Sequence, residues 1–284
     1  MAQCDHNCSN CGSKCEGSIN YFNLNENSHI KHIVGIVSGK GGVGKSATTS
    51  LIATNFKKLG YKVGILDADI TGPSIPKAFG VTNSITGNQS LMFPQLTKLG
   101  IKIVSINLLL EHADDPVLWR GPIVGGAIKQ FYEDVLWEDL DYLFIDMPPG
   151  TGDVALTIFQ SIPLDGVIIV STPQDLVHMI VGKALKMANM MNIPVLGLVE
   201  NMSYIKCPNC NTVIEPFGPS KLEEIAAEFK IKPLIKMPID PNLASIIDKG
   251  QIEDYDTSFL DDLVKNLNQD LAHKIKLKKI VNEN

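Results

Sequence analysis

Short apolar runs alternate along the chain with longer segments of helical spacing. The runs are rich in β-branched residues, and they cover residues 33–38, 62–67, 101–106, 141–146, 166–171, 194–201 and 233–237. Between them lie segments with apolar residues three and four positions apart, at 45–59, 124–136, 153–161, 177–192, 221–229 and 243–249. Buried strands separated by helices are typical of a parallel sheet covered on both faces. The pattern therefore predicts an α/β fold, a mostly parallel sheet with helices on both faces.

The two ends of the chain depart from this alternation. Residues 1–28 are polar and rich in Asn, Ser and Gly, so we predict a flexible N-terminal arm followed by one domain over residues 29–284. A last helix is expected over residues 259–276, with an apolar stripe that favours docking on the core. A membrane-surface helix is the alternative, which Asp261, Asp262 and Asp270 disfavour. The stripe consists of Leu260, Leu263, Val264, Leu267 and Leu271.

Composition narrows the possible partners. The 284 residues are 44% hydrophobic and carry a net charge of −6, so no global field favours nucleic acid. No apolar run reaches the roughly 18 residues that a membrane span needs. The first residues form no apolar signal region. We therefore expect a cytoplasmic protein without nucleic-acid or membrane partners.

A glycine-rich segment follows the first predicted strand and precedes the first predicted helix. In the pattern G-x-x-x-x-G-K-[ST], backbone N–H groups and the helix N-terminus surround phosphate oxygens. Lys45 then faces the β- and γ-phosphates, Ser46 offers its hydroxyl to Mg²⁺, and the backbone of Ala47 contacts the α-phosphate. The sequence therefore predicts a phosphate-binding loop. Its residues are Gly39, Lys40, Gly41, Gly42, Val43, Gly44, Lys45 and Ser46.

Carboxylates follow two of the predicted strands. Asp146 ends the run 141–146, the position from which P-loop proteins present an aspartate on the Mg²⁺ side. Asp67 and Asp69 follow the second strand, and a turn or cap role for Asp67 is an equal alternative. The loop 147–153 contains two prolines and two glycines, and we expect it to sense the γ-phosphate. The predicted Mg²⁺ site thus comprises Ser46, Asp69 and Asp146.

Six cysteines fall in two groups. Clustered cysteines in a reducing compartment more often bind metal or perform redox chemistry than form disulfides. Cys207 and Cys210 form a C-x-x-C, for which a zinc knuckle and a redox pair are alternatives. Two copies of this loop would supply four thiolates, enough for tetrahedral zinc or a 4Fe–4S cluster, so stoichiometry predicts a homodimer. The other four thiolates can close one site within a chain, holding a stable cluster, a labile one or zinc. They are Cys4, Cys8, Cys11 and Cys15.

The phosphate loop contains a second lysine, Lys40, and with it resembles the deviant loop of the nitrogenase iron protein, septum-site and partition ATPases. In that group the early lysine reaches the nucleotide of the partner subunit, which implies a dimer that sandwiches ATP. The resemblance implies Lys40, Lys45 and Asp69 as catalytic residues, with Asp69 orienting the attacking water near Mg²⁺. Asn201, at the end of the sixth predicted strand, has the position that holds adenine there. The sequence contains no Asn/Thr-Lys-x-Asp motif for guanine, so ATP is the expected nucleotide.

The stretches 39–46, 67–74, 119–122, 146–153, 200–203 and 207–210 together resemble the Mrp and nucleotide-binding-protein (ApbC-type) family of iron–sulfur cluster carriers. The likeness spans residues 33 to about 250. It implies an ATP-dependent carrier or scaffold that transfers a 4Fe–4S cluster to apo-iron–sulfur proteins, with slow ATP hydrolysis as a gate. Cys207 and Cys210 of each subunit would be the ligands. The four N-terminal cysteines depart from the family pattern in their compact spacing.

Two other functions compete with the carrier. A septum-site or partition-type switch with structural zinc is the first, but such switches have no need of Cys207 and Cys210. A reductase like the nitrogenase iron protein is the second, but its cluster cysteines lie far apart in sequence rather than in a C-x-x-C. The cysteine pair therefore favours the carrier.

Overall fold

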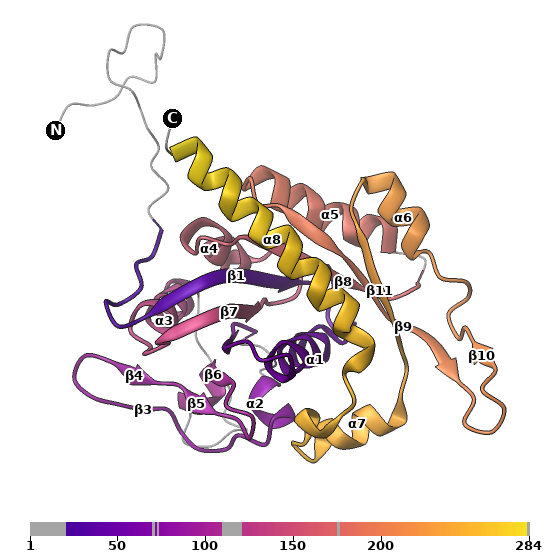
Figure 1. Cartoon of the computed structure of the whole chain (residues 1–284), viewed down its shortest axis with the longest axis horizontal. Coiled ribbons are helices and arrows are strands. Elements are labelled where there is room, and N and C mark those ends of the chain that lie inside the picture. The colour runs from indigo at the N-terminus through magenta and orange to yellow at the C-terminus, as the bar shows by residue number, and fades with distance from the viewer. Residues whose placement is uncertain (1–20, 70–71, 73, 110–120, 175–176, 283–284) are drawn as a thin grey trace, which may run out of the picture.

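The computed structural model describes residues 21–69, 72, 74–109, 121–174 and 177–282. It confirms the predicted α/β class: a sheet in the order β10-β9-β8-β1-β7-β2-β6-β5, with β11 paired to β9 (Figure 1). The seven predicted runs all form parallel strands. These are β1 (His29–Val37), β2 (Val63–Asp67), β6 (Lys102–Ser105), β7 (Asp139–Asp146), β8 (Gly166–Ser171), β9 (Val195–Lys206) and β11 (Pro233–Pro238).

Four short strands were not predicted, because two residues are too few to show a period. β5 (Gln95–Leu96) and β10 (Val213–Ile214) add antiparallel edges to the sheet, while β3 (Thr86–Gly87) and β4 (Met92–Phe93) form a separate hairpin. The prediction that Asn201 ends its strand is wrong. β9 continues to Lys206, because Tyr204 still pairs with β11 and Ile205 with β10.

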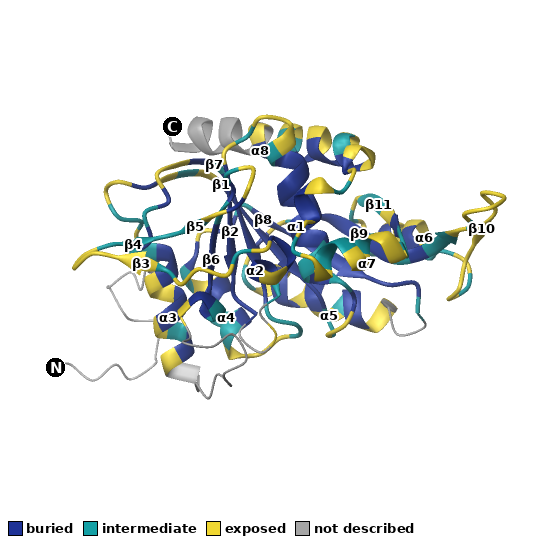
Figure 2. Cartoon of the chain, turned by 90° about the horizontal axis from the view of Figure 1, so that it is seen from below, coloured by how far each residue is buried: buried dark blue, intermediate teal, exposed yellow. Residues whose placement is uncertain are grey.

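Helices cover both faces of the sheet, each face enclosing its own apolar cluster (Figure 2). On one face lie α3 (Gly121–Glu133), α4 (Asp153–Ser161), α5 (Val177–Met190) and α6 (Leu222–Phe229). On the other lie α1 (Lys45–Lys58), α2 (Ile75–Ala78), α7 (Pro241–Asp248) and α8 (Asp261–Asn282). Three 3₁₀ turns complete the described elements: η1 (Ile106–Leu109), η2 (Ile252–Asp254) and η3 (Ser258–Leu260).

The C-terminal helix docks on the core, as its apolar stripe predicts. All five stripe residues are buried, and the Tyr142 hydroxyl donates a 2.7 Å hydrogen bond to Oδ1 of Asn268. Because the stripe is buried against the core, these five side chains are not available to bind a lipid surface. Within the described residues, no helix combines the length and apolarity needed to cross a membrane.

The predicted arm does not extend to residue 28. The Asn25 amide donates to the carbonyl oxygens of Glu133 (2.7 Å) and Val135 (2.8 Å). The Ser28 hydroxyl accepts a 2.9 Å hydrogen bond from the N–H of Trp137, and Phe22 packs against the apolar cluster. Composition alone missed this docking because it rests on a few polar side chains. Residues 1–20 lie outside the described part of the chain.

We predict that Asn25→Ala lowers the free energy of unfolding by about 1–3 kcal/mol, because two carbonyl oxygens lose their donors. Urea unfolding monitored by circular dichroism measures the change. Asn27→Ala is the matched control, since the Asn27 side chain is exposed on the same segment. Equal midpoints for the two variants would show that the Asn25 bonds do not hold the segment.

Candidate nucleotide and metal site

The phosphate-binding loop lies between β1 and α1, at the carboxyl edge of the parallel strands. Gly42 and Gly44 both have φ of +78°, a left-handed conformation that glycine adopts without strain. A Cβ on Gly44 would lie 2.2 Å from Nδ2 of Asn201, and one on Gly39 would lie 2.1 Å from Cγ2 of Ile180. Glycine is therefore required here both by the turn and by the close approach of β9 and α5.

The Lys45 ammonium is buried between two carboxylates. Its Nζ lies 2.7 Å from Oδ2 of Asp146 and 3.5 Å from Oδ2 of Asp69. Only 6% of the Lys45 side chain is exposed, and Asp146 is fully buried. The structure thus brings together three residues that the sequence predicted from separate segments of the chain.

Asp146 also accepts two hydroxyl hydrogen bonds from α1. Ser46 Oγ donates to Oδ2 at 2.6 Å, and Thr49 Oγ1 donates to Oδ1 at 2.8 Å. Thr49 escaped the sequence analysis, although its place three residues after Ser46 puts it on the same helix face. The hydroxyl of Ser46 and the carboxylates of Asp69 and Asp146 form a set of hard oxygen donors, the chemistry that Mg²⁺ prefers.

Asp67 is fully buried at the end of β2, beside Asp146 in the parallel register of β2 and β7. Its carboxylate accepts from the Asp69 N–H (3.2 Å) and the Ser105 hydroxyl (3.1 Å). Burial, reinforced by the nearby charge of Asp146, raises the pKa of Asp67 well above its ordinary value. The local bond to Asp69 fits the turn alternative, but the surroundings are those of a buried site carboxyl.

Lys40 points across the loop toward the segment after β8. Its Nζ donates a hydrogen bond to Oε1 of Gln174, and its carbonyl accepts from the Ser38 hydroxyl at 3.0 Å. Gln174 is a contact that no local pattern indicated. A cavity of about 440 Å³ opens in front of these residues. Its lining includes Lys40, Gly41, Gly42, Gly44, Lys45, Ser46, Ala47, Asp69 and Pro149.

Asn201 lies behind the phosphate loop rather than among the residues that line this cavity. Its Nδ2 donates a 2.9 Å hydrogen bond to the carbonyl of Val43. Glu200 directly precedes Asn201 in β9 and is buried. Its carboxylate accepts hydrogen bonds from the Ser203 hydroxyl (2.6 Å) and the N–H of Lys221 (3.2 Å). The structure therefore gives Asn201 a contact to the loop backbone, and its adenine role stays a prediction.

The C-x-x-C forms the turn between β9 and β10. The Cys207 N–H donates to the Thr212 carbonyl and the Asn211 N–H donates to the Cys207 carbonyl, each at 2.9 Å. Cys210 is exposed, and its Sγ lies 3.1 Å from the Thr212 hydroxyl. That hydrogen bond is the main cause that lowers the pKa of the Cys210 thiol. A lowered pKa favours the thiolate, which is the form that binds metal.

One chain does not complete a metal centre within the described residues. No group of three or more His, Cys, Asp or Glu side chains there is arranged to hold a metal ion. The C-x-x-C therefore supplies two thiolates and needs ligands from elsewhere. The predicted ligands Cys4, Cys8, Cys11 and Cys15 lie outside the described part of the chain, as do residues 119 and 120 of one matching stretch.

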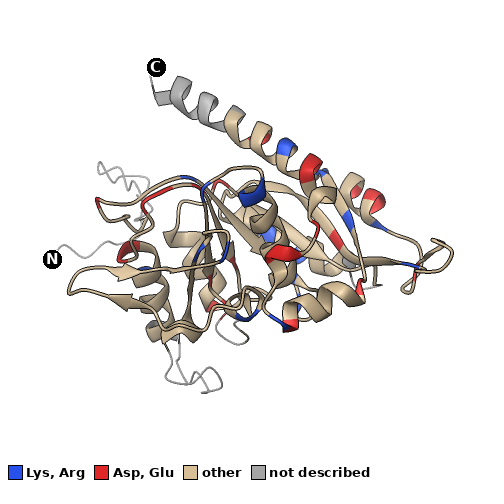
Figure 3. Cartoon of the chain, turned by 60° about the horizontal axis from the view of Figure 1, so that its bottom comes forward, with Lys and Arg blue, Asp and Glu red and all other residues tan. Residues whose placement is uncertain are grey.

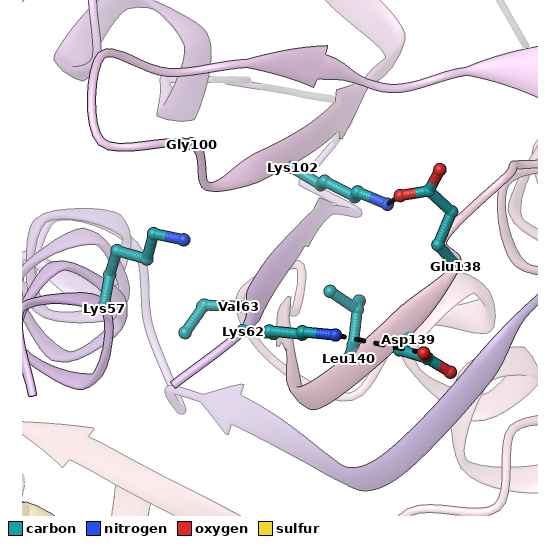
Figure 4. A pocket seen from close by; sticks show the side chains of 8 residues that line it. All are labelled: Lys57, Lys62, Val63, Gly100, Lys102, Glu138, Asp139 and Leu140. Carbon is teal, nitrogen blue, oxygen red and sulfur yellow. Dashed lines mark hydrogen bonds and ion pairs between the residues drawn. The ribbon is translucent and has the colours of Figure 1, made fainter. Parts of the chain in front are cut away.

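A second cavity of about 260 Å³ lies at the opposite edge of the sheet, where β2 and β7 begin (Figure 4). Three lysines face it, but Lys102 lies 2.6 Å from Glu138 and Lys62 lies 3.9 Å from Asp139. Ligands of open α/β sheets bind at the carboxyl ends of the strands. The paired charges and the position both argue against a second nucleotide site.

A parallel sheet, a phosphate loop leading into α1 and a buried aspartate at the end of β7 define a P-loop NTPase. The family model that matches residues 29–275 is described as ParA, NUBPL iron-transfer P-loop NTPase. The chain belongs to this family.

Two relatives with similar sequences carry the same name. The chain is 49% identical over 236 residues to the "Iron-sulfur cluster carrier protein" of Clostridium perfringens, covering 80% of this chain and 82% of that protein. It is 48% identical over 261 residues to the protein of the same name from Methanocaldococcus jannaschii, covering 88% and 90%. The predicted resemblance to the carrier family is thereby confirmed.

Solved structures agree with the fold. The nucleotide-binding protein of Archaeoglobus fulgidus, in complex with ADP and with cobalt, superposes with a TM-score of 0.74 at 43% identity. The superposition covers 82% of this chain and 91% of that one. The MinC:MinD cell division complex of Aquifex aeolicus gives a TM-score of 0.59 at 19% identity, over 85% and 96%, which shows the shared fold alone.

We predict that Asp67→Asn reduces the pH dependence of folding stability. Because the folded state holds the Asp67 proton more tightly than the unfolded chain does, ionisation of Asp67 opposes folding. The wild type should lose stability relative to the variant as the pH rises from about 4 through the raised folded pKa. The loss amounts to about 1.4 kcal/mol for each unit of pKa shift.

Urea unfolding of nucleotide-free, metal-free protein between pH 4 and 8 measures this difference. Asp139→Asn is the control, because the Asp139 side chain is largely exposed. Wild-type and Asp67→Asn stabilities that run parallel over the whole range would contradict the assignment of a raised pKa to Asp67.

Proposed function

We propose that this chain is an ATP-dependent iron–sulfur cluster carrier, in which nucleotide hydrolysis gates transfer of a 4Fe–4S cluster to apo-proteins. One observation carries the proposal: the strand β9 contacts the phosphate loop through Asn201 and ends at Lys206, the residue directly before Cys207 of the thiolate pair. The names of the relatives, iron–sulfur cluster carriers, support the same function. A nucleotide site and a cargo site thus share one element.

ATP binding begins with a change of partner for Lys45. The ammonium pairs with Asp146 and Asp69, and triphosphate oxygens would draw it forward into the cavity. Its departure would free carboxylate oxygens beside the Ser46 hydroxyl. Mg²⁺ usually binds through one or two carboxylates together with substrate phosphates, so the donors present fit it once ATP is bound. The ion would then neutralise charge on the β- and γ-phosphates.

Asp69 would orient the attacking water. Its Oδ2 lies 3.5 Å from Nζ of Lys45, and the residue lines the cavity. Lys40 would supply a second cation to the nucleotide of a partner subunit in a homodimer. In the separate chain its ammonium rests on Gln174, so dimerisation would have to exchange a neutral acceptor for phosphate oxygens. Hydrolysis would accordingly be slow until two subunits meet.

The cluster is the cargo, and Cys207 and Cys210 are its ligands. Each chain offers two thiolates at a turn, and a four-ligand cluster needs two chains. Loss of the γ-phosphate would alter the loop around Val43, and the Asn201 hydrogen bond would transmit the change along β9 toward the cysteines. Recipients are apo-proteins with free cluster ligands.

Asp69→Asn should bind ATP with nearly native affinity and hydrolyse it about 100-fold or more slowly, because an amide orients the water poorly. Lys45→Ala should lose nucleotide binding, because the charge that faces the phosphates is gone. Titration calorimetry with ATP and phosphate release measure the two properties. Asp139→Asn, which lies outside the lining of the nucleotide cavity, should match the wild type in both ATP affinity and hydrolysis rate. Native hydrolysis by Asp69→Asn would refute the assignment.

A cluster that bridges two chains fixes the iron content. In a full-length protein with the four N-terminal cysteines changed to serine, anaerobic reconstitution should load about two irons per chain and yield a dimer. Cys207→Ser in that background should lose the cluster, while Asn209→Ser in the same turn should retain it. Nucleotide affinity should not change. One zinc per dimer, or a fully loaded monomer, would contradict the bridging cluster.

A further inference from the structure

The hairpin that carries the cysteine pair extends from the body of the molecule, with β10 at the end of the sheet order (Figure 1). Residues 208–217 are all exposed (Figure 2). Three of them are large and apolar: Val213, Ile214 and Phe217 are 58%, 50% and 43% exposed. No residue from 207 to 214 is charged, and Lys206 and Glu215 flank this uncharged segment; the outermost part of the hairpin is tan in Figure 3. An exposed apolar strand, β10, therefore lies directly beside the turn that carries Cys207 and Cys210.

The register leaves the backbone of Val213 facing outward. The Cys207 N–H donates to the Thr212 carbonyl at 2.9 Å, and Val213 lies opposite Lys206. Antiparallel ladders alternate hydrogen-bonded and non-hydrogen-bonded pairs, so Lys206 and Val213 form a non-hydrogen-bonded pair. The N–H and C=O of Val213 therefore point away from β9. Within the described chain, β9 is the one strand paired with β10. This edge can accept one more strand.

A second copy of the chain does not suit this edge. Two β10 strands paired antiparallel about a two-fold axis would leave their β9 strands on the outside of a four-stranded ribbon. Neighbouring strands lie about 4.8 Å apart, and three such spacings would separate the two β9 strands. The two Cys207 positions would therefore be roughly 14 Å apart, and the two turns would point in opposite directions. Thiolate–metal bonds are only about 2.3 Å long, so the two cysteine pairs would be separated instead of joined.

We propose that the open edge of β10 is the docking strand for the apo-protein that receives the cluster. An extended, largely apolar segment of the recipient would add to the sheet by pairing with the backbone of Val213. Its side chains would contact Ile214 and Phe217. The inference rests on the proposed carrier function. A segment in this position runs about 4.8 Å from β10, which places a recipient cysteine beside the turn that holds the cluster.

The exchange itself is a balanced ligand substitution. Each recipient thiol loses a proton and forms an iron–sulfur bond, while one bond from iron to Cys207 or Cys210 breaks. The released carrier thiolate takes up the proton. No electron is transferred, and the cluster keeps its oxidation state.

Val213→Pro tests the edge directly. Proline removes the outward N–H of Val213 and leaves the bonds between β9 and β10 untouched, and proline is tolerated at an edge strand with its nitrogen facing outward. Val213→Thr is the matched control, because it keeps both the N–H and the β-branch. The cluster-loaded full-length proteins are mixed with purified apo-aconitase, and recovery of aconitase activity gives the transfer rate. Iron content and solution mass are measured before mixing.

Val213→Pro should load iron and dimerise like the wild type and transfer its cluster about fivefold to tenfold more slowly, as expected for a lost backbone hydrogen bond in the docked complex. Val213→Thr should transfer at the native rate. A native transfer rate for Val213→Pro overturns the proposal. Loss of the dimer or of the cluster in Val213→Pro also overturns it, and assigns the edge to contact between copies.

Failure of the proposed function has a different signature. If the loaded wild type itself restores no aconitase activity, the carrier function fails, and the docking strand fails with it. If the wild type transfers and only the edge variant is unaffected, the docking strand alone is wrong. Phe217→Ala provides a second variant without any backbone change, and it should also slow transfer while leaving iron content unchanged.

Discussion

The balance of charge around Lys45 is the interaction on which the rest of the site depends. Two carboxylates, Asp146 and Asp69, contact one ammonium, and a third, Asp67, is buried beside Asp146 in the register of the sheet. Buried charges are tolerated only when they are paired or neutralised. Without phosphate the lysine performs that task, and with Mg²⁺ and ATP the ion would take it over. Nucleotide binding would thus be an exchange of countercharges rather than the filling of an empty cleft.

Much of this was predictable because it is local in sequence. The glycines that require φ of +78°, the lysine and serine that follow them, and Asp146 at a strand end all belong to short patterns with a mechanical reason. The partners that complete the site were not predictable. Gln174 reaches Lys40 across 134 residues, and Ser105 reaches Asp67 across 38, so only the order of the strands brings them together. Asn25 likewise docks through polar bonds that carry no periodicity.

The length of β9 has the largest functional consequence among the departures from expectation. A strand that ended at Asn201 would leave the cysteine pair on a separate loop with its own freedom of movement. Instead the strand continues through Tyr204, held by β11, and through Ile205, held by β10. A displacement of the phosphate loop at Val43 therefore has a continuous, hydrogen-bonded route to Cys207. Coupling between the two sites would require β9 to adopt two arrangements that each site favours to a different degree.

The two sites that β9 connects have opposite requirements for solvent. Phosphoryl transfer needs buried charges and an ordered water, and Lys45 and Asp146 are almost completely enclosed. Ligand exchange at a cluster needs an incoming thiolate to reach iron, so the cysteines have to be exposed at a turn with room beside it. Cys210 meets this condition, and the outward backbone of Val213 offers a recipient a place to pair. An edge strand left open in this way is an aggregation hazard that folds usually suppress. Its presence beside the proposed cargo site therefore argues for a partner that covers it during transfer.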